Sequence, residues 1–592
     1  MMRLRREVYG WASLALGALA IGAFYDAAQL HGNYRHLRHG LSFVPRDELA
    51  FLLWYGWWGG LAMLSLGVAI YRLLGARLVL AFDRCATRPV HVLVLLALPV
   101  FVGVLALRAY VLGGEPVADD ELVYEFSARN LVLGKLTSVP PIDPDFLRNQ
   151  FIVIDGRRWH GKYPLGHSLL LAPFELLGRV DLLGGSLALA NLAATYAVAR
   201  RLIGERAGFA ASLLLAVSPH FLLTHATLLS QTSSSLLTLL AVLASLRHDE
   251  TQAARWLVLM GAVLGLGVCT RPMPLLLVAV VLIAERVWHA GSTSVALRQG
   301  LYWGAPLAAF AALFLWVNYV QSESPWSSGH KEWHQGALGT FQNIQGELTN
   351  SLGGALVREN AWLFGWPWSL LFVPFARLPR KAALAWGIVA TGLVYRLVVP
   401  KTVVASTGPI YITELVPWLC ITSVSGMQRV HGLLIKLELP AARERVAALA
   451  AAGFVVAGCT FWPIETRELV RGARAREGVK RALLDQGTSR ALVFCDTVID
   501  PTSFASWAYF APNPWPDLRD DVLYLRVPPG TDGMPRALRL WQDRFPDRPA
   551  FLYVPSRGYG TMCRLDAHRP GTCAGLRSQA IVESPAETQD GP

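Results

Sequence analysis

The sequence predicts a polytopic, all-helical membrane protein with a small C-terminal α/β domain. Of its 592 residues, 53% are hydrophobic and only 16% are charged, and the mean hydropathy is +0.37. An ordinary soluble domain carries about 25% charged residues. Long apolar runs recur between residues 8 and 462, and several are uncharged over the ~20 residues that a helix needs to cross a bilayer. These observations exclude a conventional soluble enzyme.

The apolar runs predict about 13 membrane-spanning helices. They lie at residues 8–24, 49–71, 90–112, 182–198, 207–223, 228–246, 256–270, 274–283, 301–320, 361–375, 382–399, 410–424 and 446–462. The expected domains are an N-terminal region of extra helices at 1–89, a transmembrane module at 90–462 and a C-terminal domain at 463–592.

The basic residues predict a cytoplasmic N-terminus in the cytoplasmic membrane. Arg3, Arg5 and Arg6 precede the first helix, and membrane proteins collect Lys and Arg in their cytoplasmic loops. Every second loop is also basic, through Arg72, Arg77, Arg84, Arg88, Arg200, Arg201, Arg206, Arg377, Arg380, Lys381, Lys436, Arg443 and Arg445. The loops 113–164 and 321–360 and the C-terminal domain then lie outside the cytoplasm. A cleaved signal peptide at residues 3–23 is an alternative that leaves the later topology unchanged.

The same rule accounts for the net charge of +12. Because no nucleic-acid-binding motif accompanies the charge, we expect no nucleic-acid partner.

The C-terminal domain is expected to combine strands and helices. Strand-like runs at 491–495, 522–527 and 550–554 alternate with Pro-rich turns and follow a helix-like stretch at 465–484. Cys563 and Cys573 form a disulfide if this side is oxidising, and two free thiols are the alternative. The polar residues from about 578 onwards are expected to be disordered.

The first outer loop carries the strongest chemical signal. Asp119, Asp120 and Glu121 follow a membrane helix directly and precede an apolar-rich segment at 122–133. A carboxylate held at the bilayer surface can act as a general base on a hydroxyl group. The alternative is that Asp119 or Asp120 only caps the N-terminus of the following helix.

The end of this loop predicts a hairpin and a cluster of donors. The pair Asp155-Gly156 lies between two extended runs, which is a strong hairpin signal. Lys162, together with His160 and His167, places cationic or donor groups beside the membrane, an arrangement that suits a lipid phosphate. The alternative for Lys162 is an interfacial lysine that only reaches towards water.

Other outward-facing candidates are ionisable or aromatic. An ionisable residue in or beside a membrane segment is a functional candidate by default, although each of these is also explained as an interfacial anchor or as a polar residue with a local partner. The candidates are Arg271, His220, His225, Glu414 and, in the second outer loop, Trp326, His330, Lys331, Trp333 and His334.

Taken in order, these motifs resemble the GT-C membrane glycosyltransferases. The pattern consists of Asp120-Glu121, Tyr124, Gly161-Lys162-Tyr163-Pro164, Thr270-Arg271-Pro272 and a late Gly-Pro-x-Tyr-x-x-Glu-Leu-x-Pro at 408–417. It is similar to the bacterial branch related to protein O-mannosyltransferases, of glycosyltransferase family 39, and to the lipid A aminoarabinose transferase. The resemblance covers residues 90–424. Ile410 stands where that family has Arg.

The resemblance implies an inverting hexosyl- or pentosyltransferase that works outside the cytoplasmic membrane. Its donor is a sugar carried on a polyprenyl phosphate, and its acceptor is a glycan, a lipid or a protein. By position, Asp120 is the catalytic base, Asp119 and Glu121 are neighbours that modulate it or hold the acceptor, and Lys162 contacts the lipid phosphate. The remaining substrate-binding candidates are Tyr124, His160, Tyr163, His167, Arg271 and Glu414.

No cofactor is required for this chemistry, and a divalent cation at the acidic cluster is the alternative. Two other functions fit the same pattern. One is a flippase or transporter of lipid-linked sugars, and the other is a non-catalytic assembly subunit in cell-envelope glycan synthesis.

Overall fold

The structure, a computed structural model, describes most of the chain. The described residues are 2–30, 54–141, 143–147, 151–327, 356–377, 383–398, 407–496, 512, 514–528, 530–554, 560–566 and 573. Contacts divide the chain into two compact units. The first unit consists of Met1–Arg108, Asp181–Phe314 and Gly339–Glu468, and the second of Ala109–Val180, Leu315–Leu338 and Leu469–Pro592.

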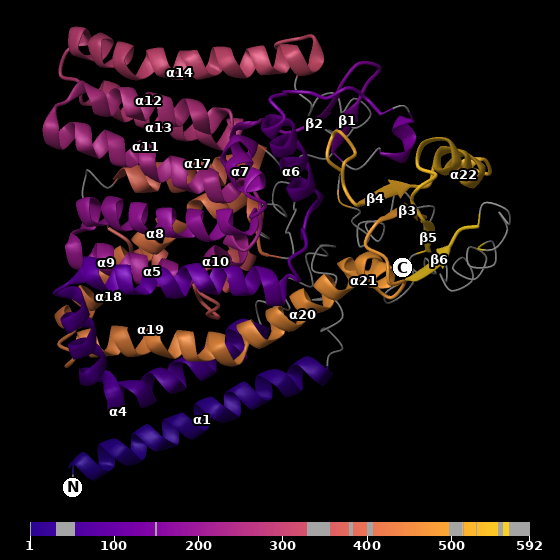
Figure 1. The fold of residues 1–592 in the computed structure, drawn as a ribbon. Helices are drawn as coiled ribbons and strands as arrows, with labels where there is room; N and C mark the ends of the chain where they lie inside the picture. The colour runs from indigo at the N-terminus through magenta and orange to yellow at the C-terminus, as the bar shows by residue number, and fades with distance from the viewer. Residues whose placement is uncertain are drawn as a thin grey trace, which may run out of the picture. The chain divides into compact units, whose positions relative to one another are not determined.

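The first unit is built from apolar helices, of which α8, α11 and α12 lie side by side (Figure 1). Its helices are α1 (Met2–Leu30), α4 (Gly60–Ala86), α5 (Pro89–Ala106), α8 (Asp181–Ile203), α9 (Glu205–Ala216), α10 (Pro219–His225), α11 (Gln231–Thr251), α12 (Ala254–Val268), α13 (Pro272–Trp288), α14 (Thr293–Ser322), α17 (Ala383–Val398), α18 (Val416–Lys436), α19 (Ala442–Cys459) and α20 (Phe461–Arg476), with the short helices η1 (Tyr55–Gly59), η2 (Leu107–Val111), η5 (Val373–Phe375) and η7 (Ile410–Leu415). Helices α14 and α20 continue into the second unit.

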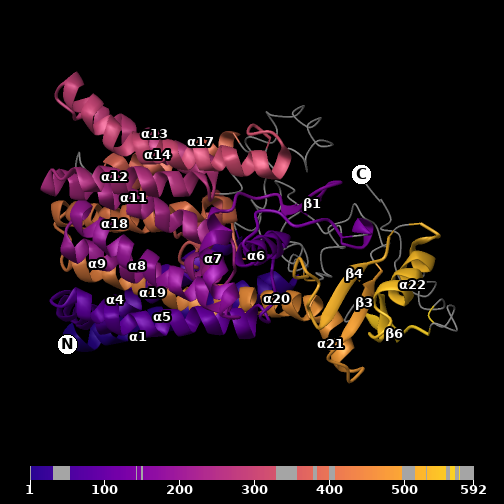
Figure 2. The same cartoon turned by 45° about the horizontal axis from the view of Figure 1, so that its top comes forward.

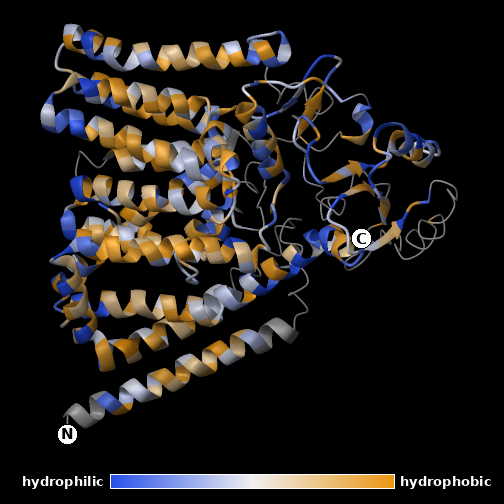
Figure 3. Ribbon diagram, viewed as in Figure 1, coloured by the Kyte–Doolittle hydropathy of each residue, from blue (hydrophilic) through white to orange (hydrophobic). Residues whose placement is uncertain are grey.

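The hydropathy of these helices identifies a multi-pass membrane protein. Apolar residues predominate along them (Figure 3). Within the described residues, seven helices are long and apolar enough to cross a membrane, or eight if the pair α9 and α10, bent by 59°, forms one span. The predicted number of about 13 is therefore not reproduced, because several apolar helices are too short for a full crossing.

The structure does not form the span predicted at residues 361–375. After the first two residues this segment consists of turns and ends in η5. Gly365 has a φ of +69°, which the right-handed helix cannot accommodate. Pro367 and Pro374 have no amide hydrogen to donate within a helix.

The second unit combines helices with a mixed sheet. Its sheet has the order β4-β3-β5-β6 (Figure 1), in which β4, β3 and β5 are parallel and β6 is antiparallel. Strands β3 and β4 lie side by side in Figure 2. The elements are α6 (Asp119–Val132), η3 (Pro144–Phe146), β1 (Ile152–Ile154), β2 (Trp159–Gly161), α7 (Gly166–Leu176), α21 (Gly478–Leu484), β3 (Ala491–Cys495), β4 (Val522–Arg526), α22 (Gly533–Arg544), β5 (Ala550–Val554) and β6 (Thr561–Arg564). Strands β1 and β2 form the antiparallel hairpin predicted around Asp155-Gly156.

The C-terminal sheet and the first outer loop share one hydrophobic core. Alternate residues of a strand face opposite sides, so Leu492 and Phe494 of β3 pack on one side of the sheet. Their core includes Phe126 of α6 and Phe146 of η3, with the rings of Phe146 and Phe494 6.0 Å apart. The compact unit therefore includes the first outer loop.

Ion pairs connect the same two parts of the chain. Arg536 of α22 donates to Asp143 at 2.8 Å and to Asp145 at 2.9 Å, and Lys480 of α21 donates to Glu115 at 2.5 Å. The three segments predicted to lie outside the cytoplasm all contribute residues to this unit.

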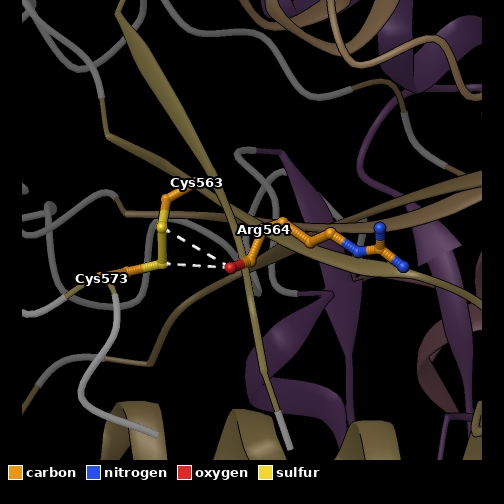
Figure 4. The surroundings of a disulfide bond; sticks show 3 residues. All are labelled: Cys563, Arg564 and Cys573. Atoms are coloured by element: carbon orange, nitrogen blue, oxygen red, sulfur yellow. Dashed lines mark hydrogen bonds between the residues drawn. A yellow bond between two sulfur atoms is a disulfide. The ribbon is translucent and has the colours of Figure 1, made fainter. Parts of the chain in front are cut away.

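A disulfide joins Cys563 of β6 to Cys573 (Figure 4). Both sulfur atoms lie 3.6 Å from the carbonyl oxygen of Arg564. This decides between the two alternatives that the sequence leaves open. Disulfides persist in oxidising compartments, which agrees with the expected extracytoplasmic location. The polar end of the chain, 574–592, is outside the described residues.

The shared core predicts that damage in β3 destabilises the whole second unit. Phe494→Ala is expected to lower the free energy of unfolding by about 3–5 kcal/mol, because Phe494 is fully buried. Thermal unfolding of the purified protein measures this loss. Leu484→Ala is the control, since Leu484 is 74% exposed and its truncation should change stability by less than about 0.5 kcal/mol. Equal effects of the two variants would contradict a shared core.

Candidate active site

The N-terminus of α6 presents the three acidic residues in different ways. Its N-cap residue, Ala118, has no side chain that caps the helix. Glu121, the third residue of the helix, instead turns back and accepts a hydrogen bond from the amide of Val117 at 2.8 Å. Val117 lies one residue before the N-cap, whereas the glutamate of a capping box accepts from the amide of the N-cap residue itself. Glu121 is fully buried and interacts electrostatically with Arg476. Of the three acids, Glu121 is therefore the one that holds the backbone just ahead of the helix.

Asp119 and Asp120 are the two acidic residues at the candidate site. Asp120 is half-buried and accepts a hydrogen bond from the hydroxyl group of Tyr163. Asp119 is buried, and its Oδ2 atom has no hydrogen-bond partner among the described residues. Burial, with the adjacent charge of Asp120, raises the pKa of Asp119 well above its usual range, against the opposing effect of Lys162. Asp119 therefore binds a proton more readily than an ordinary aspartate.

Lys162 lies among aromatic rings beside these carboxylates. It is only 4% exposed, and its Nζ atom lies 3.2 Å from the ring centroid of Phe151 and 4.8 Å from that of Tyr163. The ring of Tyr163 packs at a tilt against Tyr124, with centroids 5.0 Å apart, and Tyr124 contacts the buried His167 at 4.8 Å. Tyr163 thus links Asp120 to Lys162.

Gly161 explains why these residues meet. A Cβ atom at this position would lie 2.6 Å from the side chains of both Val123 and Ser127 on α6. Only a residue without a side chain allows the hairpin to approach the helix this closely. The next two residues, Lys162 and Tyr163, are thereby placed beside the first turn of α6.

His160, a candidate cationic or donor group from the sequence, lies in strand β2 of the hairpin. It is 1% exposed, and its Nδ1 atom lies 3.0 Å from the carbonyl oxygen of Gly161. Burial lowers the pKa of His160, because a buried imidazole disfavours the charged form. At neutral pH the side chain is therefore neutral.

The first unit contains a second polar cluster. Arg271 pairs with Glu414 at 2.8 Å, so the structure joins two candidates that are 143 positions apart in the sequence. The Nδ1 atom of His220 lies 2.7 Å from Glu359, and its Nε2 atom lies 3.0 Å from the hydroxyl group of Thr413, which precedes Glu414. No motif distinguishes Glu359 in the sequence, and only its buried pairing with His220 identifies it.

The remaining candidates have other environments. His225 is buried, with Nδ1 2.8 Å from the carbonyl oxygen of Phe221 and Nε2 3.2 Å from Asn191, which matches the explanation that its partners are local. Trp326 is 79% exposed. The other candidates of the second outer loop, His330, Lys331, Trp333 and His334, are outside the described residues.

The sequence leaves open a divalent cation at the cluster of Asp119, Asp120 and Glu121. Over the described ranges, no group of three or more His, Cys, Asp and Glu residues is placed to hold a metal ion. Within the acidic cluster, Glu121 is directed to the amide of Val117 instead.

Comparison with solved structures identifies the architecture. The structure of ArnT from Cupriavidus metallidurans bound to undecaprenyl phosphate matches with a TM-score of 0.50 at 14% identity, covering 80% of this chain and 97% of that one. The apo state of the same protein matches with a TM-score of 0.50 at 16% identity, covering 80% and 94%.

The fold is GT-C. Residues 185–319 also match the family described as dolichyl-phosphate-mannose-protein mannosyltransferase. The resemblance of this GT-C chain to the ArnT and protein mannosyltransferase type, which the sequence motifs indicate, is thus confirmed. No curated protein sequence shows significant similarity to it.

The raised pKa of Asp119 predicts a pH-dependent effect of its replacement. The folded state holds this proton more tightly than the unfolded chain, so the free energy of unfolding falls as pH rises from about 4 towards the raised pKa. Asp119→Asn cannot ionise and escapes this loss. Its stability relative to wild type should therefore increase between about pH 4 and pH 8, measured by thermal unfolding. A constant difference would contradict a raised pKa of Asp119. Asp543→Asn, on the exposed side of α22, controls for loss of a carboxylate.

The buried pair in the first unit predicts a large effect of removing one partner. Glu359→Ala leaves a ring nitrogen of His220 without its hydrogen-bond partner in a fully buried environment and is expected to lower the free energy of unfolding by about 1–3 kcal/mol. Thermal unfolding measures this change. Glu323→Ala removes a carboxylate that is 64% exposed in its pairs with Arg157 and Arg158, and should cost about 1 kcal/mol at most. A small effect at Glu359 would show that the pair contributes little to stability.

Proposed function

We propose that the chain is an inverting glycosyltransferase that moves a sugar from a polyprenyl phosphate to a hydroxyl group of an extracytoplasmic acceptor. The observation that carries the proposal is the grouping of Asp120, Tyr163 and Lys162 in one unit of a GT-C fold. A base and a cation are the two groups that this transfer requires.

Asp120 is the proposed general base. Its Oδ1 atom accepts a hydrogen bond from the hydroxyl group of Tyr163, which fixes the carboxylate and leaves the second oxygen able to accept a proton. Asp120 is only half-buried, whereas Asp119 is buried. Asp120 is thus the more accessible of the two to an acceptor hydroxyl.

Lys162 is the proposed contact for the departing phosphate. When the acceptor oxygen attacks the anomeric carbon, the bond from that carbon to the phosphate oxygen breaks, and the polyprenyl phosphate takes the electron pair. The proton of the hydroxyl passes to Asp120. The leaving group needs positive charge more than it needs an acid, and an ammonium group held close to the base supplies that charge.

The comparisons support the class of donor. The similar ArnT structure holds undecaprenyl phosphate, and the matching family is described by a dolichyl-phosphate-linked mannose donor. The proposed donor is therefore a sugar linked to a polyprenyl phosphate, and the acceptor is a glycan, a lipid or a protein. Location in the cytoplasmic membrane, with the second unit outside the cytoplasm, belongs to the same proposal.

The proposal predicts that Asp120→Asn abolishes transfer. Purified protein is supplied with a panel of polyprenyl-phosphate sugars and a membrane lipid extract as the source of acceptor. Release of free polyprenyl phosphate is measured, and we expect Asp120→Asn to reduce it by about 10²- to 10⁴-fold, the usual effect of losing a general base. Asp145→Asn is the matched control, because Asp145 pairs with Arg536 at the surface, and it should retain wild-type activity.

Two results would contradict the proposal. If Asp120→Asn released free polyprenyl phosphate as fast as wild type, Asp120 would not be the general base. The second result is that folded protein consumes no donor in the panel but moves labelled lipid between the leaflets. This result would favour a flippase over a transferase.

A further inference from the structure

Phe151 and Lys162 are joined by two contacts at the end of the β1–β2 hairpin. The amide of Lys162 donates to the carbonyl oxygen of Phe151 at 3.0 Å, next to the last paired residues, Ile152 and Gly161. The ammonium group of Lys162 lies 3.2 Å from the centroid of the Phe151 ring. The same residue thus fixes both the backbone and the charged end of Lys162.

The backbone of Phe151 is in an unfavourable conformation. Its φ is +64°, in the left-handed region that bulky residues rarely adopt. Such a conformation persists only where the surroundings impose it, and it concentrates at functional sites. The ring of Phe151 also packs edge-on against Tyr163 at 6.0 Å. Phe151 therefore keeps a strained backbone together with an aromatic face over the cation.

This contact changes how Lys162 meets an anion. A lysine ammonium is a strongly hydrated charge on a flexible stem, and both properties weaken its binding to an anion. The ring of Phe151 replaces water on one side of the ammonium and attracts it electrostatically, while Tyr163 approaches at 4.8 Å. The ammonium group of Lys162 therefore loses less bound water and less conformational freedom when it binds an anion.

We propose that Phe151 is a positioning residue that holds the ammonium group of Lys162 against its aromatic face, ready to bind the phosphate of the lipid substrate. The proposal rests on the proposed function in taking Lys162 as the phosphate contact. The opposite possibility is a cover that must leave before the phosphate can bind, and it predicts the reverse effect of removing the ring.

Direct binding tests the proposal without requiring turnover. The full chain in lipid nanodiscs is titrated with undecaprenyl phosphate, which carries no sugar. Phe151→Leu keeps apolar bulk but removes the aromatic face, and we expect it to weaken binding about 10-fold. Phe151→Tyr keeps the face and should bind within about 3-fold of wild type. Phe545→Leu removes a ring near Arg548 of the same unit and should leave binding unchanged.

A background without the lysine tests whether Phe151 acts through it. Lys162→Met should weaken binding at least as much as Phe151→Leu, and adding Phe151→Leu to Lys162→Met should have no further effect. In a transfer assay with a polyprenyl-phosphate sugar that the protein consumes, Phe151→Leu should raise the KM for that donor about 10-fold and change kcat by less than about 3-fold. A general disturbance of the fold would also lower kcat and would weaken binding further in the Lys162→Met background.

Phe151→Gly separates positioning from stability. Glycine adopts the left-handed conformation without strain, so this variant should unfold at a temperature no lower than that of Phe151→Leu, yet bind as weakly. Any of four results would overturn the proposal: Phe151→Leu binding as tightly as wild type or more tightly, equal loss in the Leu and Tyr variants, an undiminished effect in the Lys162→Met background, or unchanged binding in Lys162→Met alone.

The two proposals fail separately. If no donor is consumed but undecaprenyl phosphate binding depends on Phe151 as described, the transferase function is wrong and the positioning function stands. If transfer depends on Asp120 while the Phe151 variants bind normally, only the positioning function is wrong.

Discussion

The contact between the β1–β2 hairpin and helix α6 determines the geometry of the candidate site. Gly161 allows the hairpin to touch Val123 and Ser127, and Trp159 packs against Phe126 with ring centroids 4.8 Å apart. The cation and tyrosine that follow Gly161 therefore lie beside the carboxylates that begin α6. Because the C-terminal sheet shares this core, residues some 400 positions away help to hold the helix that carries Asp120.

Differences in burial assign different properties to neighbouring acids. Glu121 is engaged by a backbone amide, Asp119 is buried with a raised pKa, and Asp120 is half-buried and oriented by Tyr163. Three adjacent carboxylates thus become a residue that binds the backbone before the helix, a proton-binding residue and a candidate base. Rotation along the first turn of one helix is enough to produce this division, because successive side chains point in different directions.

Buried ionisable side chains in the first unit are paired because the membrane-embedded protein offers them little water. Arg271 with Glu414 and His220 with Glu359 each join elements far apart in the chain. Removing one partner leaves the other side chain buried without its hydrogen bond or counter-charge. The pairs therefore fix how η7, α10 and the start of α13 pack, and they hold Arg271 in one orientation.

The sequence alone determined that the protein spans a membrane, because hydropathy is a local property of each helix, and the order of short motifs indicated the GT-C fold. Local turn chemistry likewise predicted the hairpin at Asp155-Gly156. The helix at 361–375 was predicted wrongly because apolar composition outweighed Gly365 and Pro367. Only the tertiary structure decided the hydrogen bond of Glu121 with Val117, the burial of His160, the pairing of His220 with Glu359 and the ring of Phe151 over Lys162. Each of these features depends on burial and on contacts between residues that are not neighbours in the sequence. Burial and such contacts cannot be calculated from spacing along the chain.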